Sequence, residues 1–252
     1  MKYKLLLADI DDTLTLNLGM PPRNFIPSQQ LVSTINKAVS RVYISFCTGR
    51  DKDTTIKICK KLGLTSPQII EGGAKIIDVE GKTLWVKYVS IASINKIFKI
   101  LKTITTSFSL IVDGKEIVDI IPTNNLDKIT AVLCYNLSKD QIQKIKQVLI
   151  PCKDIVITVN HDRTGNTIYI TDKLGTKTHG VRKLTEMLNV DKNEVIGIGD
   201  GNNDQTFLLE CGLKVAMGNA VSGVKQIADY VAPDVEDDGV AHVIEKFILL
   251  KS

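Results

Sequence analysis

Hydrophobic and polar positions alternate along the first part of the chain in blocks that predict strands and helices in turn. Residues 3–8 form an apolar run typical of a buried strand, and a helical pattern over about 28–40 leads to a second apolar run over 42–47. A helical pattern over 52–62 and a short apolar run near 68–70 follow. This βαβα alternation predicts a parallel sheet with right-handed crossovers.

The rhythm changes between residues 81 and 175. A helical pattern around 91–104 is followed by two strand-like runs, and a second one around 138–149 is followed by two more. The four runs cover 110–112, 129–134, 155–159 and 167–171. One helix and two strands, repeated, predicts a small α+β unit with an open antiparallel sheet, αββαββ, inserted into the first domain.

The parallel rhythm resumes after residue 175. A helix is expected over 177–188 and a strand over 194–199, and shorter helices and strands alternate from there to a last helix over 239–250. We therefore expect an α/β core in two halves, residues 1–80 and 176–252, with the inserted α+β unit at 81–175.

Composition excludes several classes of protein. The net charge of +4 over 252 residues is too mild for a nucleic-acid groove, and aromatic residues make up only 5%. No run approaches the ~20 apolar residues of a membrane span. The five cysteines are odd in number and form no CxxC pair, and the three histidines are scattered, so we expect reduced thiols, no zinc site and a cytoplasmic protein.

Polar clusters stand at the predicted carboxyl ends of the strands, where parallel sheets bind ligands. Asp9 and Asp11 follow the first strand and project to one face, where a hard cation such as Mg²⁺ would relieve their repulsion. Thr48-Gly49-Arg50 follows the second strand and offers a hydroxyl and backbone N–H groups to a phosphate. A third cluster at 199–204 and Lys177 at a helix start complete the set. Taken singly, the acidic cluster also fits a solvated turn, and Thr-Gly-Arg a capping turn.

Together these motifs resemble the haloacid dehalogenase superfamily, in its Cof-like branch of phosphatases with a large α/β cap. The resemblance rests on six segments in order: 9–13, 48–50, 177, 199–204, 216–220 and 238–241. It implies a Rossmann-like core with helices on both faces, and it identifies the inserted unit as a cap. One departure is Gly72 in Glu-Gly-Gly-Ala at 71–74, where the family often has asparagine. We expect this departure to bear on substrate orientation.

The resemblance also implies roles for the site residues. Asp9 would be the nucleophile, Asp11 the proton donor and acceptor, and Lys177 a catalytic cation. The expected metal ligands of Mg²⁺ are Asp9, Asp11 through its backbone carbonyl, Asp200 and, directly or indirectly, Asp204. The expected phosphate-binding groups are Thr48, Gly49, Lys177 and Asn203.

The expected activity is therefore Mg²⁺-dependent hydrolysis of a small phosphorylated metabolite, phosphoglycolate or a sugar phosphate, through an aspartyl-phosphate. The expected partners are this small molecule and at most a second copy of the chain, with neither nucleic acid nor membrane. A phosphomutase is the alternative within the family, and a non-catalytic binding protein on the same fold is a third hypothesis.

Overall fold

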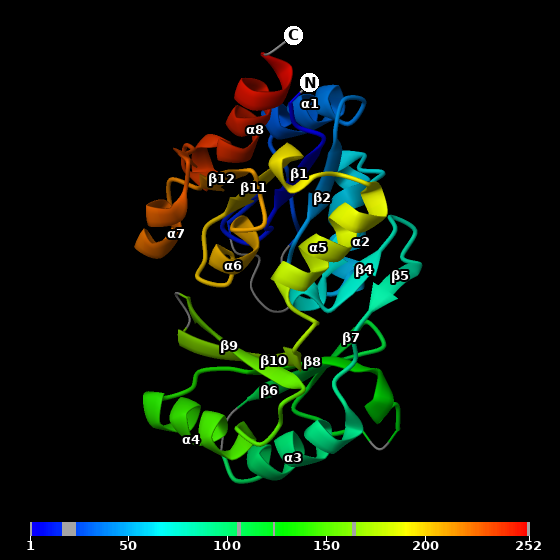
Figure 1. Cartoon of the computed structure of the whole chain (residues 1–252), viewed down its shortest axis with the longest axis vertical. Helices are drawn as coiled ribbons and strands as arrows, with labels where there is room; N and C mark the ends of the chain where they lie inside the picture. Colours follow the sequence, from blue (N-terminus) through cyan, green and yellow to red (C-terminus); the bar gives the residue numbers. More distant parts are fainter. Residues whose placement is uncertain (1, 17–23, 105–106, 123, 163–164, 251–252) are drawn as a thin grey trace.

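A parallel five-stranded sheet forms the centre of one half of the computed structural model (Figure 1). The structure describes residues 2–16, 24–104, 107–122, 124–162 and 165–250. The strand order of this core sheet is β13-β12-β11-β1-β2. The strands are β1 (Leu5–Ala8), β2 (Tyr43–Phe46), β11 (Val195–Gly199), β12 (Leu213–Ala216) and β13 (Tyr230–Val231).

The order of the core sheet reverses beside β1. From β1 the chain moves outward to β2, while the second half of the chain returns at β11, on the other side of β1, and moves outward to β12 and β13. Such a reversal opens a crevice at the carboxyl ends of the two central strands, because the following loops leave in opposite directions. Residues after Ala8 and after Gly199 therefore meet at one place.

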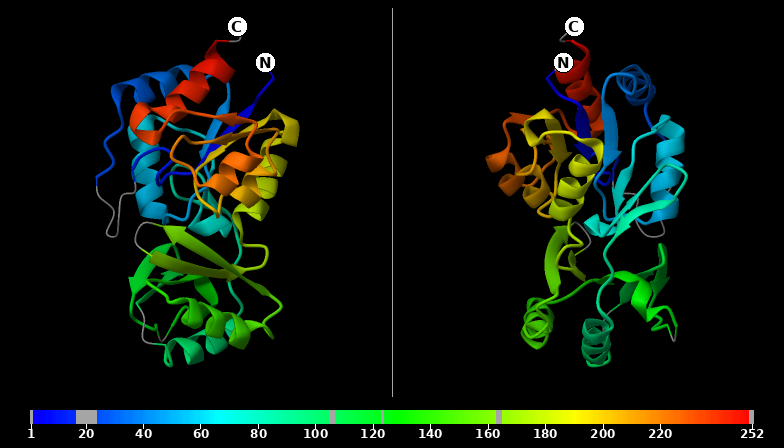
Figure 2. Two further views of the ribbon diagram at one scale, coloured as in Figure 1. Left: turned by 90° about the vertical axis from the view of Figure 1, so that its left-hand side faces the viewer. Right: turned by 45° about the vertical axis from the view of Figure 1, so that its right-hand side comes forward.

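Helices cover both faces of the core sheet (Figure 2). One face carries α1 (Gln29–Ala38), α2 (Lys52–Leu62) and α8 (Gly239–Ile244), which continues as a π-helical turn over Glu245–Leu249; the other carries α5 (Lys177–Leu188), α6 (Gln205–Leu208) and α7 (Ser222–Ile227). The spacing of apolar residues explains the packing. In α1, for example, Leu31, Ile35 and Ala38 recur at helical intervals and are all buried.

A three-stranded antiparallel sheet, β3-β4-β5, extends the edge of the core beyond β2. It contains β3 (Gln68–Ile70), β4 (Lys75–Ile77) and β5 (Thr83–Val86), and a parallel bridge between Cys47 and Ile69 joins it to the end of β2. The sequence pattern indicated β3 but neither β4 nor β5. Because β5 pairs with β4, we propose that the inserted unit begins after Val86 and not at residue 81, and that it ends near Gly175.

The second sheet, which we call the cap sheet, has the order β7-β6-β8-β10-β9 and is antiparallel throughout. Its strands are β6 (Phe108–Val112), β7 (Lys115–Val118), β8 (Ile129–Cys134), β9 (Ile155–Asp162) and β10 (Gly165–Asp172). Helices α3 (Ile91–Leu101) and α4 (Lys139–Leu149) cover the face that points away from the core sheet (Figure 1). The predicted fold class, a parallel α/β core with an antiparallel α+β cap, is confirmed.

The cap has one strand more than the expected αββαββ pattern. The additional strand, β7, is a partly exposed edge strand, so its Lys-Glu-Ile-Val sequence lacks the apolar run of a buried strand. Asp113 and Gly114 join it to β6, both with positive φ, +50° and +80°. Asp-Gly is the strongest short hairpin signal in a sequence, because both central residues of a type I′ turn need positive φ. That signal could have revealed β7.

Two expectations about the chemistry of the chain as a whole can be checked. All five cysteines are free and buried, as expected of reduced thiols. Among the described residues, no helix combines the length and the apolar character that crossing a bilayer demands.

Candidate active site

Asp9 and Asp11 follow β1 into the crevice of the core sheet. Asp9 is buried, at 7% exposure, and its N–H donates to the Ile198 carbonyl of β11 at 3.1 Å. Asp11 is less buried, and each of its carboxylate oxygens accepts from the Arg50 guanidinium, Oδ2 from Nε at 2.7 Å and Oδ1 from a terminal nitrogen at 2.5 Å. Asp12 has a positive φ of +56° and belongs to the turn. The two carboxylates expected on one face thus have different partners.

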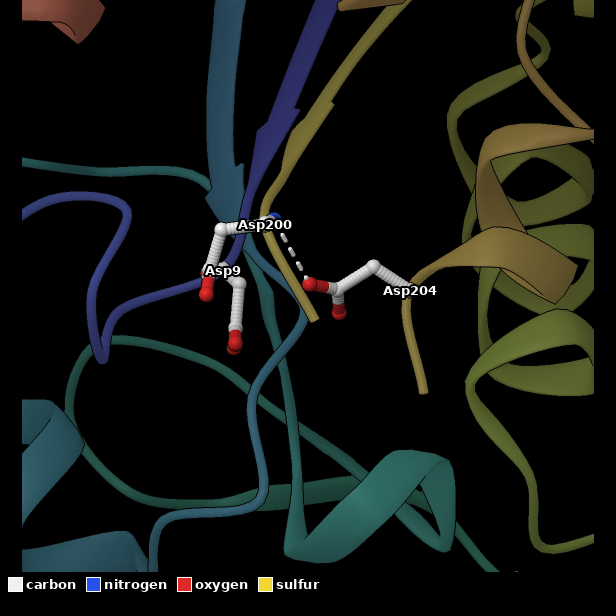
Figure 3. A group of neighbouring side chains, drawn as sticks. All are labelled: Asp9, Asp200 and Asp204. Atoms are coloured by element: carbon white, nitrogen blue, oxygen red, sulfur yellow. Dashed lines mark hydrogen bonds between the residues drawn. The ribbon is translucent and has the colours of Figure 1, made fainter. Parts of the chain in front are cut away.

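Asp200 and Asp204 join Asp9 in a carboxylate cluster (Figure 3). Asp200 follows β11, and one carboxylate oxygen from each of the three residues lies within 4.8 Å of the others. Asp200 Oδ1 accepts a hydrogen bond from the Thr13 hydroxyl at 2.6 Å. Loops separated by about 190 positions in sequence therefore place the expected nucleophile and the expected metal ligands together, as the reversal of strand order requires.

Asp204 is fully buried and has partners on both carboxylate oxygens. Its Oδ2 accepts from the backbone N–H groups of Asp200, at 3.0 Å, and Gly201, at 2.9 Å. Its Oδ1 accepts from Lys177 Nζ at 2.7 Å. We propose that Asp204 holds the loop and the lysine in place, and that it acts on a metal indirectly.

Lys177 begins α5 and is buried at 5% exposure. Thr176 caps this helix, and Lys177 Nζ reaches back to lie 3.0 Å from Asp9 Oδ1. Burial disfavours the ammonium, but the charges of Asp204 and Asp9 outweigh burial and raise the pKa of Lys177. The side chain therefore remains a cation at neutral pH, next to the expected nucleophile.

The carboxylate cluster fits a divalent cation. Among the described residues, the three carboxylates of the cluster lie beside a single ammonium, that of Lys177, so negative charge is in excess. Burial, with the neighbouring carboxylates, raises the pKa of Asp9 to about 7 and that of Asp200 to about 8, although Lys177 opposes the shift of Asp9. Asp9 Oδ1 is buried and accepts no hydrogen bond of good geometry, although the ammonium is close. Hard oxygen donors with excess negative charge suit Mg²⁺.

Thr48 and Gly49 lie at the end of β2, beside the same crevice. Thr48 is fully buried, and its hydroxyl accepts from the Arg50 N–H at 3.1 Å. The Thr48 N–H donates to the Ile69 carbonyl and is not available to a phosphate. The Gly49 N–H, in contrast, has no acceptor among the described residues. Two donors are therefore available to a phosphate here, the hydroxyl of Thr48 and the N–H of Gly49.

A cavity of about 100 Å³ lies between the core and the cap sheet. Gly49, Lys177 and Asn203, three of the expected site residues, line it. The remaining lining residues are Gly72, Thr158, Tyr169, Thr171, Thr176, Asn202 and Thr206. A larger hollow of about 570 Å³ lies on the outer surface around α5 and contains none of the expected site residues.

Sequence reasoning left three neighbours of this site without a role. Arg50 was part of a quoted motif, but nothing in its sequence position indicated that it binds Asp11. Thr13 was in the same situation, although a hydroxyl two residues after Asp11 can reach the loop after β11. Tyr169 reaches the site from the cap sheet, and such a contact between distant segments has no local signal.

Comparison with known proteins agrees with this architecture. The family model of the haloacid dehalogenase-like hydrolases matches residues 6–125 and 115–244. A 5-amino-6-(5-phospho-D-ribitylamino)uracil phosphatase of Bacillus subtilis is 28% identical over 98% of this chain and 96% of its own length. A phosphoglycolate phosphatase of Methanobrevibacter smithii is 40% identical, but over 34% of this chain and 37% of its own.

Solved structures share the whole fold. BT1666 of Bacteroides thetaiotaomicron, a phosphatase of the same superfamily, has a TM-score of 0.82 over 98% of this chain and 96% of its own, at 19% identity. The sugar phosphatase BT4131 has a TM-score of 0.80 over 98% and 99%, at 18% identity. Since the family model covers nearly the full length and the phosphatase of Bacillus subtilis matches from end to end, this chain belongs to the haloacid dehalogenase-like hydrolases, in their Cof-like phosphatase branch.

Proposed function

We propose that this chain is a Mg²⁺-dependent phosphatase that hydrolyses a small phosphorylated metabolite through an aspartyl-phosphate on Asp9. The observation that carries the proposal is the setting of Asp9, a buried carboxylate that shares the cluster with Asp200 and Asp204 and lies 3.0 Å from Lys177. The phosphatases of Bacillus subtilis and Methanobrevibacter smithii, both named for small phosphate monoesters, support the reaction class.

In the first half of the reaction, a carboxylate oxygen of Asp9 attacks the phosphorus atom. A new bond forms between this oxygen and phosphorus as the bond from phosphorus to the ester oxygen breaks. The departing oxygen takes a proton from the carboxyl group of Asp11. A carboxylate held on both oxygens by a guanidinium carries no proton to give. For this step one Asp11 oxygen therefore has to leave Arg50, take up a proton and face the substrate, while the other oxygen stays with Arg50.

In the second half, water hydrolyses the aspartyl-phosphate. The carboxylate of Asp11 takes a proton from the water molecule, whose oxygen attacks the phosphorus atom. The bond between phosphorus and the Asp9 oxygen breaks, which releases inorganic phosphate and restores the Asp9 carboxylate. Asp11 is then protonated again, as at the start of the first half, and the site is ready for another substrate.

The other side chains hold the phosphoryl oxygens. Lys177, the Gly49 N–H, the Thr48 hydroxyl and Asn203 would donate to them, and the Lys177 ammonium would offset the charge that the transition state spreads over these oxygens. Asp9, Asp200 and the backbone carbonyl of Asp11 would hold Mg²⁺, which when bound neutralises the repulsion between the carboxylates and the incoming phosphate.

The test is Asp9→Asn, which keeps the shape of the side chain and removes the nucleophile. We expect phosphate release with Mg²⁺ from a panel of phosphoglycolate, sugar phosphates and an aryl phosphate to fall by at least about 10³-fold. Asp12→Asn is the matched control, because it removes a neighbouring carboxylate of the turn and asparagine tolerates a positive φ. Near-normal release by a folded Asp9→Asn protein would contradict the assignment.

The same assay separates hydrolysis from phosphomutase activity. A phosphomutase needs a bisphosphate activator and keeps its aspartyl-phosphate from water. Release of free phosphate from a single monoester, without an activator, is therefore the result that the phosphatase proposal requires.

A further inference from the structure

Tyr169 is a cap residue whose side chain lies directly over two glycines of the core. Its hydroxyl oxygen is 2.8 Å from the place where a Cβ at Gly49 would lie, and its ring is 3.6 Å from the place where a Cβ at Gly72 would lie. A side chain at Gly49 and the phenol of Tyr169 would thus compete for one space. Gly72 is the position where the family often has asparagine, so here the ring lies over a position without a side chain.

The cap sheet fixes the position of this ring. Along β10, Ile168 and Ile170 point into the apolar core beneath the cap helices, while Tyr169 projects from the opposite face. Leu133 on β8 and Thr158 on β9 lie opposite Tyr169 in the sheet. A side chain carried by the middle of a paired strand keeps its place better than one on a loop, so the ring forms a defined wall of the cavity.

The cavity is small and its lining is mostly uncharged. Its volume of about 100 Å³ is well below the roughly 300–1,000 Å³ of ordinary ligand pockets. Threonine hydroxyls and asparagine amides join Tyr169 in the lining, and Lys177 is the one charged residue among the described lining residues. Lys177 already pairs with two carboxylates, and nearby Arg50 binds Asp11. The lining therefore offers hydrogen bonds but no further cation.

From this arrangement we infer that the site takes a short, uncharged, hydroxyl-bearing leaving group, and that Tyr169 is the specificity-determining residue that sets its length. The inference rests on the proposed phosphatase function. With the phosphoryl group at Gly49, the phenol occupies the space into which a longer leaving group would extend. A carboxylate on the leaving group would meet hydroxyls and amides without a free counter-charge, which costs binding energy in a confined site.

The test measures binding of non-hydrolysable phosphonates by calorimetry in the presence of Mg²⁺. The ligands are 2-hydroxyethylphosphonate, phosphonoacetate, which has a similar length but carries a carboxylate, and a phosphonate analogue of a hexose phosphate. The proteins are wild type, Tyr169→Ala and Tyr169→Phe. Tyr135→Phe is the control, because Tyr135 packs on the same face of the cap sheet and binds Ser109 through its hydroxyl but does not line the cavity.

We expect wild type to bind 2-hydroxyethylphosphonate at least about 10-fold more tightly than either other ligand, a range typical of discrimination by pocket shape. Tyr169→Ala should reduce the difference in affinity between the short and the hexose-length ligand to about 3-fold or less. Tyr169→Phe, which keeps the ring, and Tyr135→Phe should keep the affinity difference of wild type. An unchanged length dependence in folded Tyr169→Ala, or tight binding of phosphonoacetate by wild type, overturns the inference.

Turnover of the matching phosphate esters separates this inference from the proposed function. Size-selective phosphonate binding without release of phosphate from any ester would contradict the phosphatase proposal and support the role of Tyr169. Phosphate release with equal efficiency from short and hexose-length esters, in wild type and Tyr169→Ala alike, would support the phosphatase and overturn the role of Tyr169. Absence of phosphonate binding to every protein overturns the role of Tyr169, and it overturns the phosphatase proposal as well only if no ester releases phosphate.

Discussion

Replacing Asp200 by asparagine should stabilise the metal-free protein at pH 8. The rise in the pKa of Asp200 from 3.8 to about 8 corresponds to about 6 kcal/mol, and that of Asp9 from 3.8 to about 7 to about 4 kcal/mol. The two costs overlap, because the charge of Asp9 contributes to the rise at Asp200, although burial is the largest cause of both rises. Asparagine at position 200 removes one charge, and its amide oxygen can still accept the hydrogen bond of the Thr13 hydroxyl. We therefore expect a gain of at least about 2 kcal/mol, or about 4–8 °C in Tm for a chain of this size.

The pH dependence follows from the same shifts. A carboxyl whose pKa is higher in the folded state binds more protons there than in the unfolded chain, so stability falls as pH rises. The stabilising contribution of protonated Asp9 and Asp200 is complete below about pH 4 and is lost as pH rises through about 7 and 8, their folded pKa values. In Asp200→Asn the part of this slope that belongs to Asp200 should disappear, and the part that belongs to Asp9 should remain.

Thermal unfolding between pH 4 and 9, with chelator and with Mg²⁺, is the assay. Mg²⁺ should raise the Tm of wild type at pH 8 and leave that of Asp200→Asn nearly unchanged, since a cation stabilises only the state that binds it. Asp127→Asn, which removes an exposed carboxylate outside the cluster, should behave like wild type. The reasoning is refuted if Asp200→Asn is less stable than wild type in chelator at pH 8, or if Mg²⁺ stabilises both proteins equally.

Two further substitutions test the supports of the site. Lys177→Met leaves two buried carboxylates without their counter-charge, so it should stop phosphate release and destabilise the chelated protein at pH 8 by about 3–5 kcal/mol in a denaturant titration. The control Lys183→Met removes an exposed ion pair and should cost less than about 1 kcal/mol. Equal losses of stability in the two variants would contradict this. Gly73→Ala would bring a Cβ to 2.1 Å from the Thr176 carbonyl carbon at a φ of +100° and should cost about 3 kcal/mol or more. Gly63→Ala, with a positive φ but an open site, should cost about 1 kcal/mol in the same titration.

The parts of the fold that followed from the sequence are those with strong apolar periodicity. The helix over 177–188 has the expected bounds, because its buried face imposes regular spacing. Strands β4, β5 and β7 lacked such a signal: β4 is short, and β5 and β7 are partly exposed. Their pairing depends on neighbouring strands more than on their own composition.

The candidate site also has parts that the sequence indicated and parts that it did not. Strand ends of a parallel sheet converge, so Asp9, Asp200 and Lys177 could be placed together from sequence, and the structure brings them together. The pairing of Arg50 with Asp11 depends on side-chain directions across two loops, and the approach of Tyr169 depends on how the cap sheet sits over the core. Neither is encoded in a local pattern.

Direct detection of the aspartyl-phosphate tests the central claim, that Asp9 is the nucleophile. Asp11→Asn, which cannot take a proton from the attacking water, should accumulate the intermediate when it is mixed with Mg²⁺ and an aryl phosphate and quenched in acid. Mass spectrometry of the digested protein should then find one phosphoryl group on the peptide that contains Asp9, and none in the double variant Asp9→Asn, Asp11→Asn. A phosphoryl group on another residue, or rapid phosphate release by a folded Asp9→Asn protein, would contradict the account.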